Sequence, residues 1–275
     1  MQELRNKVAV ITGAGSGIGR ALAQAFASEG CNLALADINE TGLAETAALL
    51  AHHSIKITTH TCSVADRTQM QALPAEIEAA HGAIHLLFNN AGVTINKTFE
   101  DSSLEEFEFV TNINQWGVIY GCHYFLPYLK KQSEAHIVNT SSMAAFLGLP
   151  NQTSYCMTKA AVKSFSESLR AELSHYNIGV TSIHPGTIRT NILNAAAGRS
   201  GKNAEGTQKL ASLMARYGMP PEKLAVKVVK AVKTNTMQVR IGWDAVLADW
   251  LKRMLPYAIH APLQWGFNRS LKKGG

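Results

Sequence analysis

The sequence predicts an α/β protein built on one doubly wound, mostly parallel β-sheet of about seven strands with helices on both faces. Short apolar runs alternate with longer helical patterns from residue 7 to about residue 185, which is the rhythm of right-handed βαβ units. The runs are rich in Val, Ile and Leu, as are strands buried between two helix layers. No repeat, low-complexity tract or linker interrupts the pattern, so a single domain is expected.

Each expected strand is a short apolar run bounded by turn residues, and each expected helix is a longer stretch with apolar residues on one side. The expected strands are 7–12, 32–37, 56–62, 84–89, 136–141, 179–184 and 237–241. The expected helices are 18–28, 41–52, 68–81, 103–131, 153–176, 222–234 and 244–255. The domain is therefore expected to span residues 1–242, and residues 243–275 form an extension.

The composition excludes several classes of protein. The chain has 275 residues, of which 46% are hydrophobic and 17% charged, so it is neither disordered nor a disulfide-stapled miniprotein. A net charge of +6 is modest for this length and does not indicate nucleic-acid binding. The four cysteines form no CxxC pair, so no metal site is expected. Without a signal peptide or a long apolar span, a cytoplasmic protein is expected.

A glycine-rich loop, TGAGSGIG at residues 12–19, connects the first expected strand to the first helix. Backbone N–H groups and the positive end of the helix would face one point there, which suits a pyrophosphate. Glycines are needed because side chains would block the phosphates and the packing of helix against strand. The loop predicts a Rossmann fold with a dinucleotide bound by Gly13, Gly15, Ser16, Gly17, Ile18 and Gly19.

Asp37 ends the second expected strand, where a carboxylate can accept hydrogen bonds from the hydroxyls of the adenosine ribose. The same carboxylate would repel a 2′-phosphate, so NAD is favoured over NADP as the cofactor. Two alternatives stay open. Asp37 could instead cap the following turn with Asn39 nearby, and Arg20 is close enough in sequence to serve NADP.

Three side chains carry the expected chemistry. Ser142 follows the fifth expected strand, and Tyr155 and Lys159 are four residues apart on one face of an expected helix. A neighbouring ammonium would lower the pKa of the phenol, so that Tyr155 could exchange a proton with a substrate oxygen during hydride transfer. Ser142 would hydrogen-bond the same oxygen. Alone, a Tyr–Lys pair at this spacing is usually a helix surface pair; beside the glycine loop it indicates a catalytic site.

These motifs occur together in one family. From residue 5 to about residue 242, the sequence resembles the short-chain dehydrogenase/reductase family. The shared motifs are TGAGSGIG at 12–19, NNAG at 89–92, NQWG at 114–117, NTSSMA at 139–144, YCMTK at 155–159 and PGTIRT at 185–190. The resemblance implies an NAD(P)-dependent alcohol dehydrogenase or carbonyl reductase that assembles as a homodimer or homotetramer through its two long helices.

The resemblance also implies roles for individual residues. Asn114 would hold a water that links Lys159 to solvent, and Lys159 would bond the nicotinamide ribose. Further cofactor contacts are implied for Asn90, Ala91, Gly92, Pro185, Gly186, Ile188 and Thr190. Where the family commonly has an Asp-Val pair at the adenine, this chain has Ser63 and Val64, so an altered adenine contact is expected.

The substrate is expected to be hydrophobic. In such proteins a flexible lid follows the Pro-Gly motif, here over residues 190–220. The expected pocket is formed by Ser142, Met143, Ala144, Phe146, Leu147, Tyr155, Gly186, Ile192 and Leu193. This lining favours a secondary alcohol or ketone of acyl, terpenoid or steroid type. The basic residues of the lid are interpreted as solvated: Arg199, Lys202 and Arg216.

The extension is basic and rich in tryptophan. It holds three of the four tryptophans, and five basic against two acidic residues, so it carries half of the net charge. One face of the expected helix 244–255 is apolar, with Val246, Leu247, Trp250, Leu251, Met254 and Leu255. Such a segment can lie on an anionic membrane surface. Packing over the active-site cleft or against a sister subunit is favoured, because tryptophans bury well at interfaces.

Two other classes of function stay open, a catalytically silent NAD-binding sensor or scaffold and a membrane-surface binder. The intact set of Ser142, Tyr155 and Lys159 argues against the first, because a silent relative need not retain it.

Overall fold

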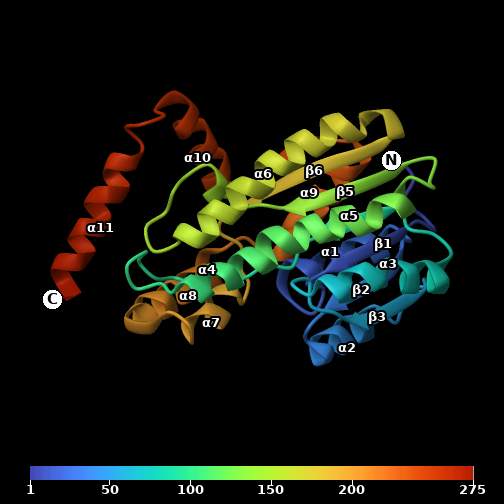
Figure 1. Cartoon of the computed structure of the whole chain (residues 1–275), viewed down its shortest axis with the longest axis horizontal. Coiled ribbons are helices and arrows are strands. Elements are labelled where there is room, and N and C mark those ends of the chain that lie inside the picture. Colours follow the sequence, from blue (N-terminus) through green and yellow to red (C-terminus); the bar gives the residue numbers. More distant parts are fainter. Residues whose placement is uncertain (275) are drawn as a thin grey trace.

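A seven-stranded sheet forms the centre of the molecule (Figure 1). The computed structural model describes residues 1–274, with side chains as far as residue 269. The strands are β1 Val8–Thr12, β2 Asn32–Asp37, β3 Ile57–Thr61, β4 Leu86–Asn89, β5 Ala135–Thr140, β6 Ile178–Pro185 and β7 Gln238–Ile241. They lie in the order β3-β2-β1-β4-β5-β6-β7, and every neighbouring pair is parallel. The predicted α/β fold is confirmed, and each strand begins and ends within two residues of its expected position.

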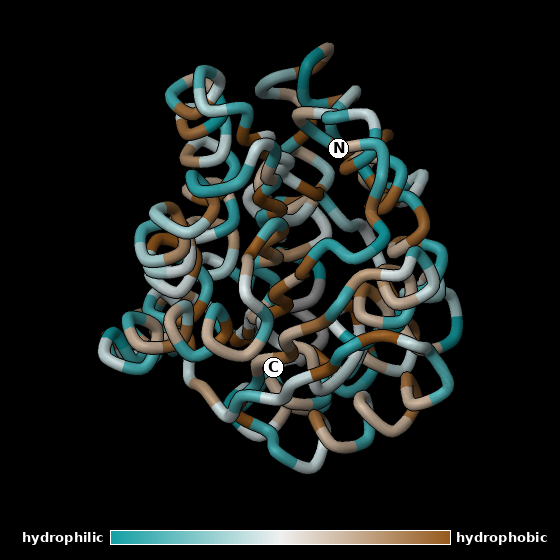
Figure 2. Tube along the Cα trace, turned by 90° about the vertical axis from the view of Figure 1, so that its right-hand side faces the viewer, coloured by the Kyte–Doolittle hydropathy of each residue, from teal (hydrophilic) through white to brown (hydrophobic). Residues whose placement is uncertain are grey.

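Helices cover both faces of this sheet. They are α1 Gly17–Ser28, α2 Glu40–Leu49, α3 Arg67–His81, α4 Leu104–Thr111, α5 Gly117–Leu129, α6 Thr153–Leu173, α7 Ile192–Ala197, α8 Ala204–Tyr217, α9 Pro221–Lys233, α10 Trp243–Met254 and α11 His260–Gly274. One apolar core joins the sheet to α1, α2 and α9, with the rings of Phe26 and Phe88 in contact at 4.6 Å. The other joins it to α3, α5 and α6 around Phe125. Figure 2 shows hydrophobic residues along the central strands, as expected for a sheet buried on both faces.

The strand order reverses between β1 and β4, which lie side by side in the middle of the sheet. In open parallel sheets this reversal leaves a crevice at the carboxyl ends of the strands, where ligands bind. Thr12, Asn89 and Thr140 end β1, β4 and β5, so the segments that follow these strands start at the same edge.

The long expected helix 103–131 is divided. A π-helical segment, Asn112–Trp116, separates α4 from α5 and contains the fully buried Asn114. The Asn114 side chain accepts the N–H of Val93 at 2.8 Å and donates to the carbonyl oxygen of Val93 at 2.8 Å. The wider π-helical turn thus places the Asn114 amide against the loop after β4. π-Helical turns occur frequently at functional sites.

The segment expected as a flexible lid, residues 190–220, is largely helical. It consists of α7, a 3₁₀ turn at Gly201–Asn203 and α8. Leu193 in α7 is buried, whereas Leu210 and Leu213 in α8 are exposed.

Helix α10 packs on the domain through its small residues and one aspartate. Ala245, Ala248 and Asp249 are its buried residues. Within the single chain, the apolar face of α10 is 43 to 61% exposed at Val246, Leu247, Trp250, Met254 and Leu255. No helix was expected over α11; Pro262 lies in its first turn, where proline is tolerated. Gly275, the end of the predicted extension, lies outside the described residues.

Two buried histidines make the fold sensitive to acid. Burial lowers the pKa of His136 in β5 to about 3 and that of His184 in β6 to about 4. Unfolded histidine takes up its proton near pH 6.5, so below that pH the unfolded state binds more protons than the folded state. Stability is therefore full above about pH 6.5 and falls toward pH 4. We expect a loss on the order of 2 kcal/mol per histidine at pH 5, measured by denaturant unfolding.

The control for this loss is a histidine at the surface. His184→Asn should show a smaller difference in unfolding free energy between pH 7.5 and pH 5, because one titrating group is gone. His175→Asn, at an exposed position, should keep the full difference. The explanation fails if all three proteins lose stability equally.

Candidate active site

The glycine loop joins β1 to α1 at the carboxyl edge of the sheet. Gly13 and Gly17 have φ angles of 67° and 52°, a left-handed backbone that glycine adopts without strain. Ser16 precedes α1 and gives the helix no side-chain cap, so its hydroxyl does not take up the first N–H groups. These donors and the positive helix end fit a pyrophosphate, and the phosphates of a dinucleotide would be held here.

The loop after β4 holds the glycine loop in place. Asn90 Nδ2 donates to the carbonyl oxygen of Thr12 at 3.0 Å, and Thr12 Oγ1 accepts from the N–H groups of Asn90 and Ala91 at 3.0 and 3.2 Å. A Cβ on Gly92 would lie 3.3 Å from Lys159 Nζ. The segment therefore connects the phosphate loop to the expected catalytic residues.

Asp37 connects the end of β2 to the glycine loop. Its Oδ2 accepts the N–H of Gly15 at 2.9 Å, and its Oδ1 accepts the N–H of Asn39 at 2.9 Å. Asn39 is the residue that caps α2, through the N–H of Gly42 at 3.0 Å. The carboxylate thus braces the turn and also stands beside the dinucleotide loop, so both interpretations of Asp37 have a structural basis.

Arg20 is engaged in contacts between α1 and α2. Its guanidinium donates to the carbonyl oxygen of Gly15 at 2.6 Å and to Thr46 Oγ1 at 3.0 Å, and it pairs with Glu45 at 2.7 Å. Arg20, the residue that left NADP possible as the cofactor, is therefore ion-paired with Glu45.

The structure brings Ser142, Tyr155 and Lys159 together. Ser142 follows β5 in an extended conformation, and its hydroxyl accepts the N–H of Ala144 at 3.1 Å. The same side chain is close enough to Tyr155 to lower the pKa of the phenol. Lys159 Nζ donates to the carbonyl oxygen of Thr140 at 2.9 Å and lies 5.6 Å from the centroid of the Tyr155 ring. Helix α6 supplies two of the three residues from one face, as their spacing predicts.

The proton affinities differ from expectation. Burial raises the pKa of Tyr155, and the hydrogen bond with Ser142 offsets only part of that rise. The ammonium of Lys159 was expected to lower this pKa, but it is directed at Thr140 and the desolvation of the phenolate dominates. Burial also lowers the pKa of Lys159 to about 8. Tyr155 is therefore a proton donor at neutral pH. Lys159 can release its proton at a pH slightly above neutral.

Asn114 lies beside this cluster. Besides its two bonds with Val93, its Nδ2 is 3.2 Å from Thr158 Oγ1, next to Lys159 in the chain. A Cβ on Gly92 would lie 3.3 Å from Asn114 Oδ1, the same distance as from the lysine nitrogen. The amide is thus adjacent to Lys159, with both its oxygen and its nitrogen already hydrogen-bonded to protein.

The segment that begins with Pro185-Gly186 at the end of β6 lies against the glycine loop. The methyl carbon of Thr190 would lie 3.3 Å from a Cβ on Gly17, and Ile188 is 3% exposed. A cavity of about 290 Å³ lies beside them, between α1, residues 189–191 and the start of α9. The predicted phosphate loop and nicotinamide segment are therefore neighbours.

The predicted adenine positions lie in the loop after β3. The N–H of Ser63 donates to Gln69 Oε1 at 2.8 Å. Val64 is 8% exposed and packs against Gly117, where a Cβ would approach its Cγ2 to 2.8 Å. Val64 therefore supports α5.

Asp244 is a residue that sequence reasoning missed. From the start of α10, its Oδ2 accepts the N–H of Thr187 at 2.6 Å, and its Oδ1 accepts the N–H of Ala245 at 2.9 Å. A Cβ on Gly186 would lie 2.0 Å from this carboxylate, so only glycine fits at the turn. The only signal available was an acidic residue at a helix start.

His184 is a second missed residue. Its Nδ1 lies 3.1 Å from the carbonyl oxygen of Ser142, and its Nε2 lies 3.2 Å from Gln238 Nε2. An amide nitrogen only donates, so Nε2 accepts and Nδ1 carries the proton given to Ser142. The Phe146 ring stacks on the imidazole at 4.7 Å. The backbone of the expected catalytic serine is thus held by the core of the sheet.

These polar contacts continue to α10. Arg240 in β7 donates to Gln238 Oε1 at 3.2 Å, and its Nε lies 2.9 Å from Asp249 Oδ2. Asp249 is 4% exposed and also pairs with Arg253 at 3.0 Å. Helix α10 is therefore linked by side chains to the histidine behind Ser142.

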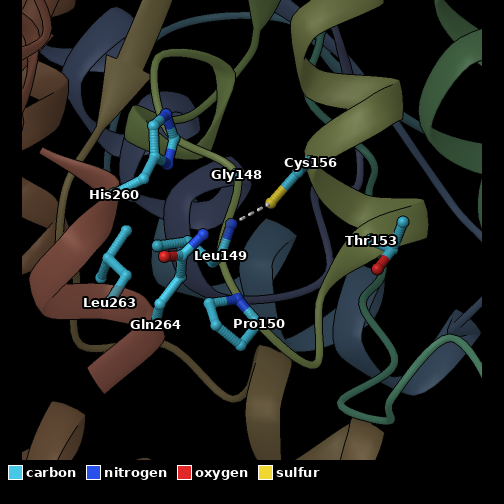
Figure 3. A pocket seen from close by; sticks show the side chains of 8 residues that line it. All are labelled: Gly148, Leu149, Pro150, Thr153, Cys156, His260, Leu263 and Gln264. Atoms are coloured by element: carbon cyan, nitrogen blue, oxygen red, sulfur yellow. Dashed lines mark hydrogen bonds between the residues drawn. The ribbon is translucent and has the colours of Figure 1, made fainter. Parts of the chain in front are cut away.

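The expected substrate pocket is partly filled by α10. Phe146 and Leu147 are 9 and 8% exposed and pack against Ala248, with Met143 at their edge. A cavity of about 340 Å³ lies farther along the same segment, between it and α11 (Figure 3). It is lined by Gly148, Leu149, Pro150, Thr153, Cys156, His260, Leu263 and Gln264.

The basic residues interpreted as solvated have local partners. Arg199 stacks on Phe109 at 4.1 Å, Arg216 lies 5.2 Å from the ring of Tyr217, and Lys202 lies 3.7 Å from Asp101 at the surface. Among residues 1–274, no group of three or more His, Cys, Asp or Glu side chains is placed to hold a metal ion. No described helix is long and apolar enough to cross a membrane.

Known proteins resemble this chain over most of its length. A family model described as short chain dehydrogenase matches residues 7–199. Putative oxidoreductase SadH of Mycobacterium tuberculosis is 34% identical over 259 residues, which are 93% of each chain. Probable oxidoreductase EphD of Mycobacterium bovis is 35% identical over 91% of this chain and 43% of its own length.

Solved structures agree. A short chain dehydrogenase/reductase from Burkholderia phymatum in complex with NAD is 31% identical, with a TM-score of 0.86 over 92% of this chain and 95% of that one. A short chain dehydrogenase from Mycobacterium paratuberculosis bound to NAD is 25% identical, with a TM-score of 0.78 over 89% and 99%. The fold is thus shared with two proteins whose structures contain NAD.

Proposed function

Because this chain belongs to the short-chain dehydrogenase/reductase family of NAD(P)-dependent oxidoreductases, we propose that it interconverts a hydrophobic secondary alcohol and its ketone, with NAD as the cofactor. The observation that carries the proposal is the convergence of Ser142, Tyr155 and Lys159 at the crevice beside the glycine loop. A serine and a tyrosine hydroxyl at one site can both hydrogen-bond a substrate oxygen.

In this mechanism the nicotinamide, when bound, gives or takes the hydride at the substrate carbon. Tyr155 exchanges the proton at the substrate oxygen, and Ser142 donates a hydrogen bond to that oxygen. Because burial raises the pKa of Tyr155, the phenol is a proton donor near neutrality, which suits reduction of a ketone. Oxidation of the alcohol requires the phenolate and is favoured at higher pH.

Lys159 has two roles in the proposal. Its ammonium stabilises the phenolate that forms when Tyr155 gives up its proton. Burial lowers the pKa of Lys159 to about 8. The Lys159 ammonium, which lies next to Asn114, can therefore also return a proton to the Tyr155 phenolate.

The lining of the larger cavity supports a hydrophobic substrate. Leu149, Pro150 and Leu263 form much of it, and no lysine or arginine is among its lining residues. The proposal is tested by a screen of aliphatic, acyl and steroid alcohols and ketones, followed by NADH absorbance with both cofactors. A polar or carboxylate substrate turned over in preference to all of these would contradict it.

Replacing Asp37 is expected to relax discrimination against NADP. Asp37→Ala removes the charge that repels a 2′-phosphate, but it also leaves the N–H groups of Gly15 and Asn39 without this acceptor. Asp37→Asn removes the charge and keeps an acceptor oxygen. We expect the kcat/KM ratio of NAD to NADP to fall by about tenfold or more in both, with the larger loss of NAD activity in the alanine variant.

Steady-state kinetics with each cofactor measures this ratio. If Asp37→Asn keeps the wild-type ratio, the carboxylate serves only to brace the turn after β2.

Self-association belongs to the same proposal. A row of aromatic rings runs from Trp116, the 44% exposed last residue of the π-helical segment, into α5. The ring centroids of Trp116 and Tyr120 are 5.6 Å apart, and those of Tyr120 and Tyr124 are 6.2 Å apart. Aromatic side chains in such a row are typical of subunit contacts. Sedimentation equilibrium would measure the assembly.

A further inference from the structure

The C-terminal helices expose several large apolar side chains. On α10 they are Trp243, Val246, Leu247, Trp250 and Met254, spaced to lie on one side of the helix and each 43 to 79% exposed. A surface helix normally buries such a stripe against its own protein, but α10 instead buries Ala245, Ala248 and Asp249. This face, together with its continuation in α11, is called the tail face below.

The tail face continues past α10. Leu255, Tyr257 and Trp265 are 48, 88 and 64% exposed. Figure 1 shows α11 at one end of the molecule, and its residues His260, Leu263 and Gln264 line the cavity beside residues 148–156. An exposed face that includes three tryptophans is larger than the scattered apolar residues found on most soluble surfaces, and it indicates an interaction site.

The charges around the tail face have one sign. Asp244 is bonded to backbone N–H groups of Thr187 and Ala245. Asp249 is 4% exposed and held by Arg240 and Arg253. No other acidic residue occurs after residue 242, so the described part of the tail presents no free carboxylate.

Cations remain beside the apolar side chains. The Arg253 side chain is 62% exposed, and the Arg269 guanidinium lies 5.2 Å from the ring of Trp265. Lys252 lies on the same helix as Arg253 and donates to the carbonyl oxygen of Pro256. The sequence adds Lys272 and Lys273, whose side chains lie outside the described part.

We propose that the tail face binds the surface of a bilayer that contains anionic phospholipid, with α10 and α11 lying in the interface. Apolar and tryptophan side chains enter the headgroup boundary, and the cations contact lipid phosphates. A second copy of the chain is a poorer occupant, because a symmetric contact would place this cationic face against itself. The inference goes beyond the proposed function and does not depend on it.

Flotation of the full-length protein with vesicles tests the proposal. Binding is expected to vesicles of phosphatidylglycerol and phosphatidylcholine, at least about tenfold tighter than to phosphatidylcholine alone, and to weaken with salt. In a Trp116→Phe protein every remaining tryptophan is on the tail. Its fluorescence should shift to the blue and be quenched by brominated lipid, because these rings enter the apolar boundary.

Matched variants separate the tail face from the rest of the surface. Trp250→Glu and Met254→Glu should each reduce binding by at least about tenfold. Val226→Glu, at a 66% exposed apolar position of α9, should leave it unchanged. Arg269→Glu should weaken binding at low salt, and Lys227→Glu on α9 should weaken it much less. Melting temperatures check that all variants fold.

Three results would overturn the proposal. The first is no flotation with anionic vesicles. The second is flotation that Trp250→Glu, Met254→Glu and Val226→Glu reduce equally. The third is a fall in the mass measured by sedimentation equilibrium for Trp250→Glu, without any vesicle binding by the wild type. That last result would identify the tail face as a contact between copies.

Discussion

Tyr155→Phe is expected to remove turnover, lowering kcat by about 10³-fold, while the affinity for NAD stays within about twofold. The substitution deletes the hydroxyl that exchanges the proton and keeps the ring that packs in the site. The affinity should persist because the glycine loop, Asp37 and Asn90 are untouched. Steady-state kinetics gives kcat, and a binding titration gives the NAD affinity.

The matched control is Tyr176→Phe, the same change at a 40% exposed ring remote in sequence from the cluster. It should be fully active. Activity retained in Tyr155→Phe would show that another group exchanges the proton. Loss of NAD binding together with activity would show that the phenol supports the cofactor and not the chemistry.

Gly19→Ala is expected to disrupt the dinucleotide site. A Cβ at this position would lie 1.9 Å from the carbonyl oxygen of Gly13, and a backbone atom cannot rotate away as a side chain can. Either α1 or the loop must move, which we expect to cost about 1–3 kcal/mol in unfolding free energy. The NAD dissociation constant should rise by about 100-fold, because the donors of α1 leave their positions.

Thermal unfolding and an NAD titration measure the two effects. Gly198→Ala is the control, since a Cβ there would meet nothing within 4 Å, and it should change stability by less than about 0.5 kcal/mol. If Gly19→Ala binds NAD like the wild type, the close approach of α1 to the loop is not needed for the site.

The fold was largely accessible from sequence because its signals are local. Strands buried on both faces are continuous apolar runs, and each is bounded by turn residues, so their positions were predicted within two residues. The π-helical turn at Asn112–Trp116 was not predicted, because it inserts no residue type that interrupts a helical pattern. The surface that covers the apolar face of α10 was left open. Periodicity identifies its apolar stripe but does not determine whether the protein or another surface covers it.

Part of the site depends on contacts between distant residues. The spacing of Tyr155 and Lys159 placed them on one face of a helix, and α6 has them so. The contact of His184 with Ser142 joins residues 42 positions apart, and that of Asp244 with Thr187 joins residues 57 positions apart. A single sequence gives no sign of such pairs. The raised pKa of Tyr155 likewise follows from burial, which is a property of the assembled site.

The carboxylates of Asp244 and Asp249 in α10 limit how far this protein can be truncated from its C-terminus. A recombinant version that stops after β7 would retain every family motif and the complete sheet. It would lack Asp244, which the N–H of Thr187 needs as its acceptor, and Asp249, which neutralises Arg240. The segment after β6 that is expected to bind the nicotinamide, and the side chains behind Ser142, would each lose a charged partner. The minimal catalytic unit therefore extends at least through Asp249.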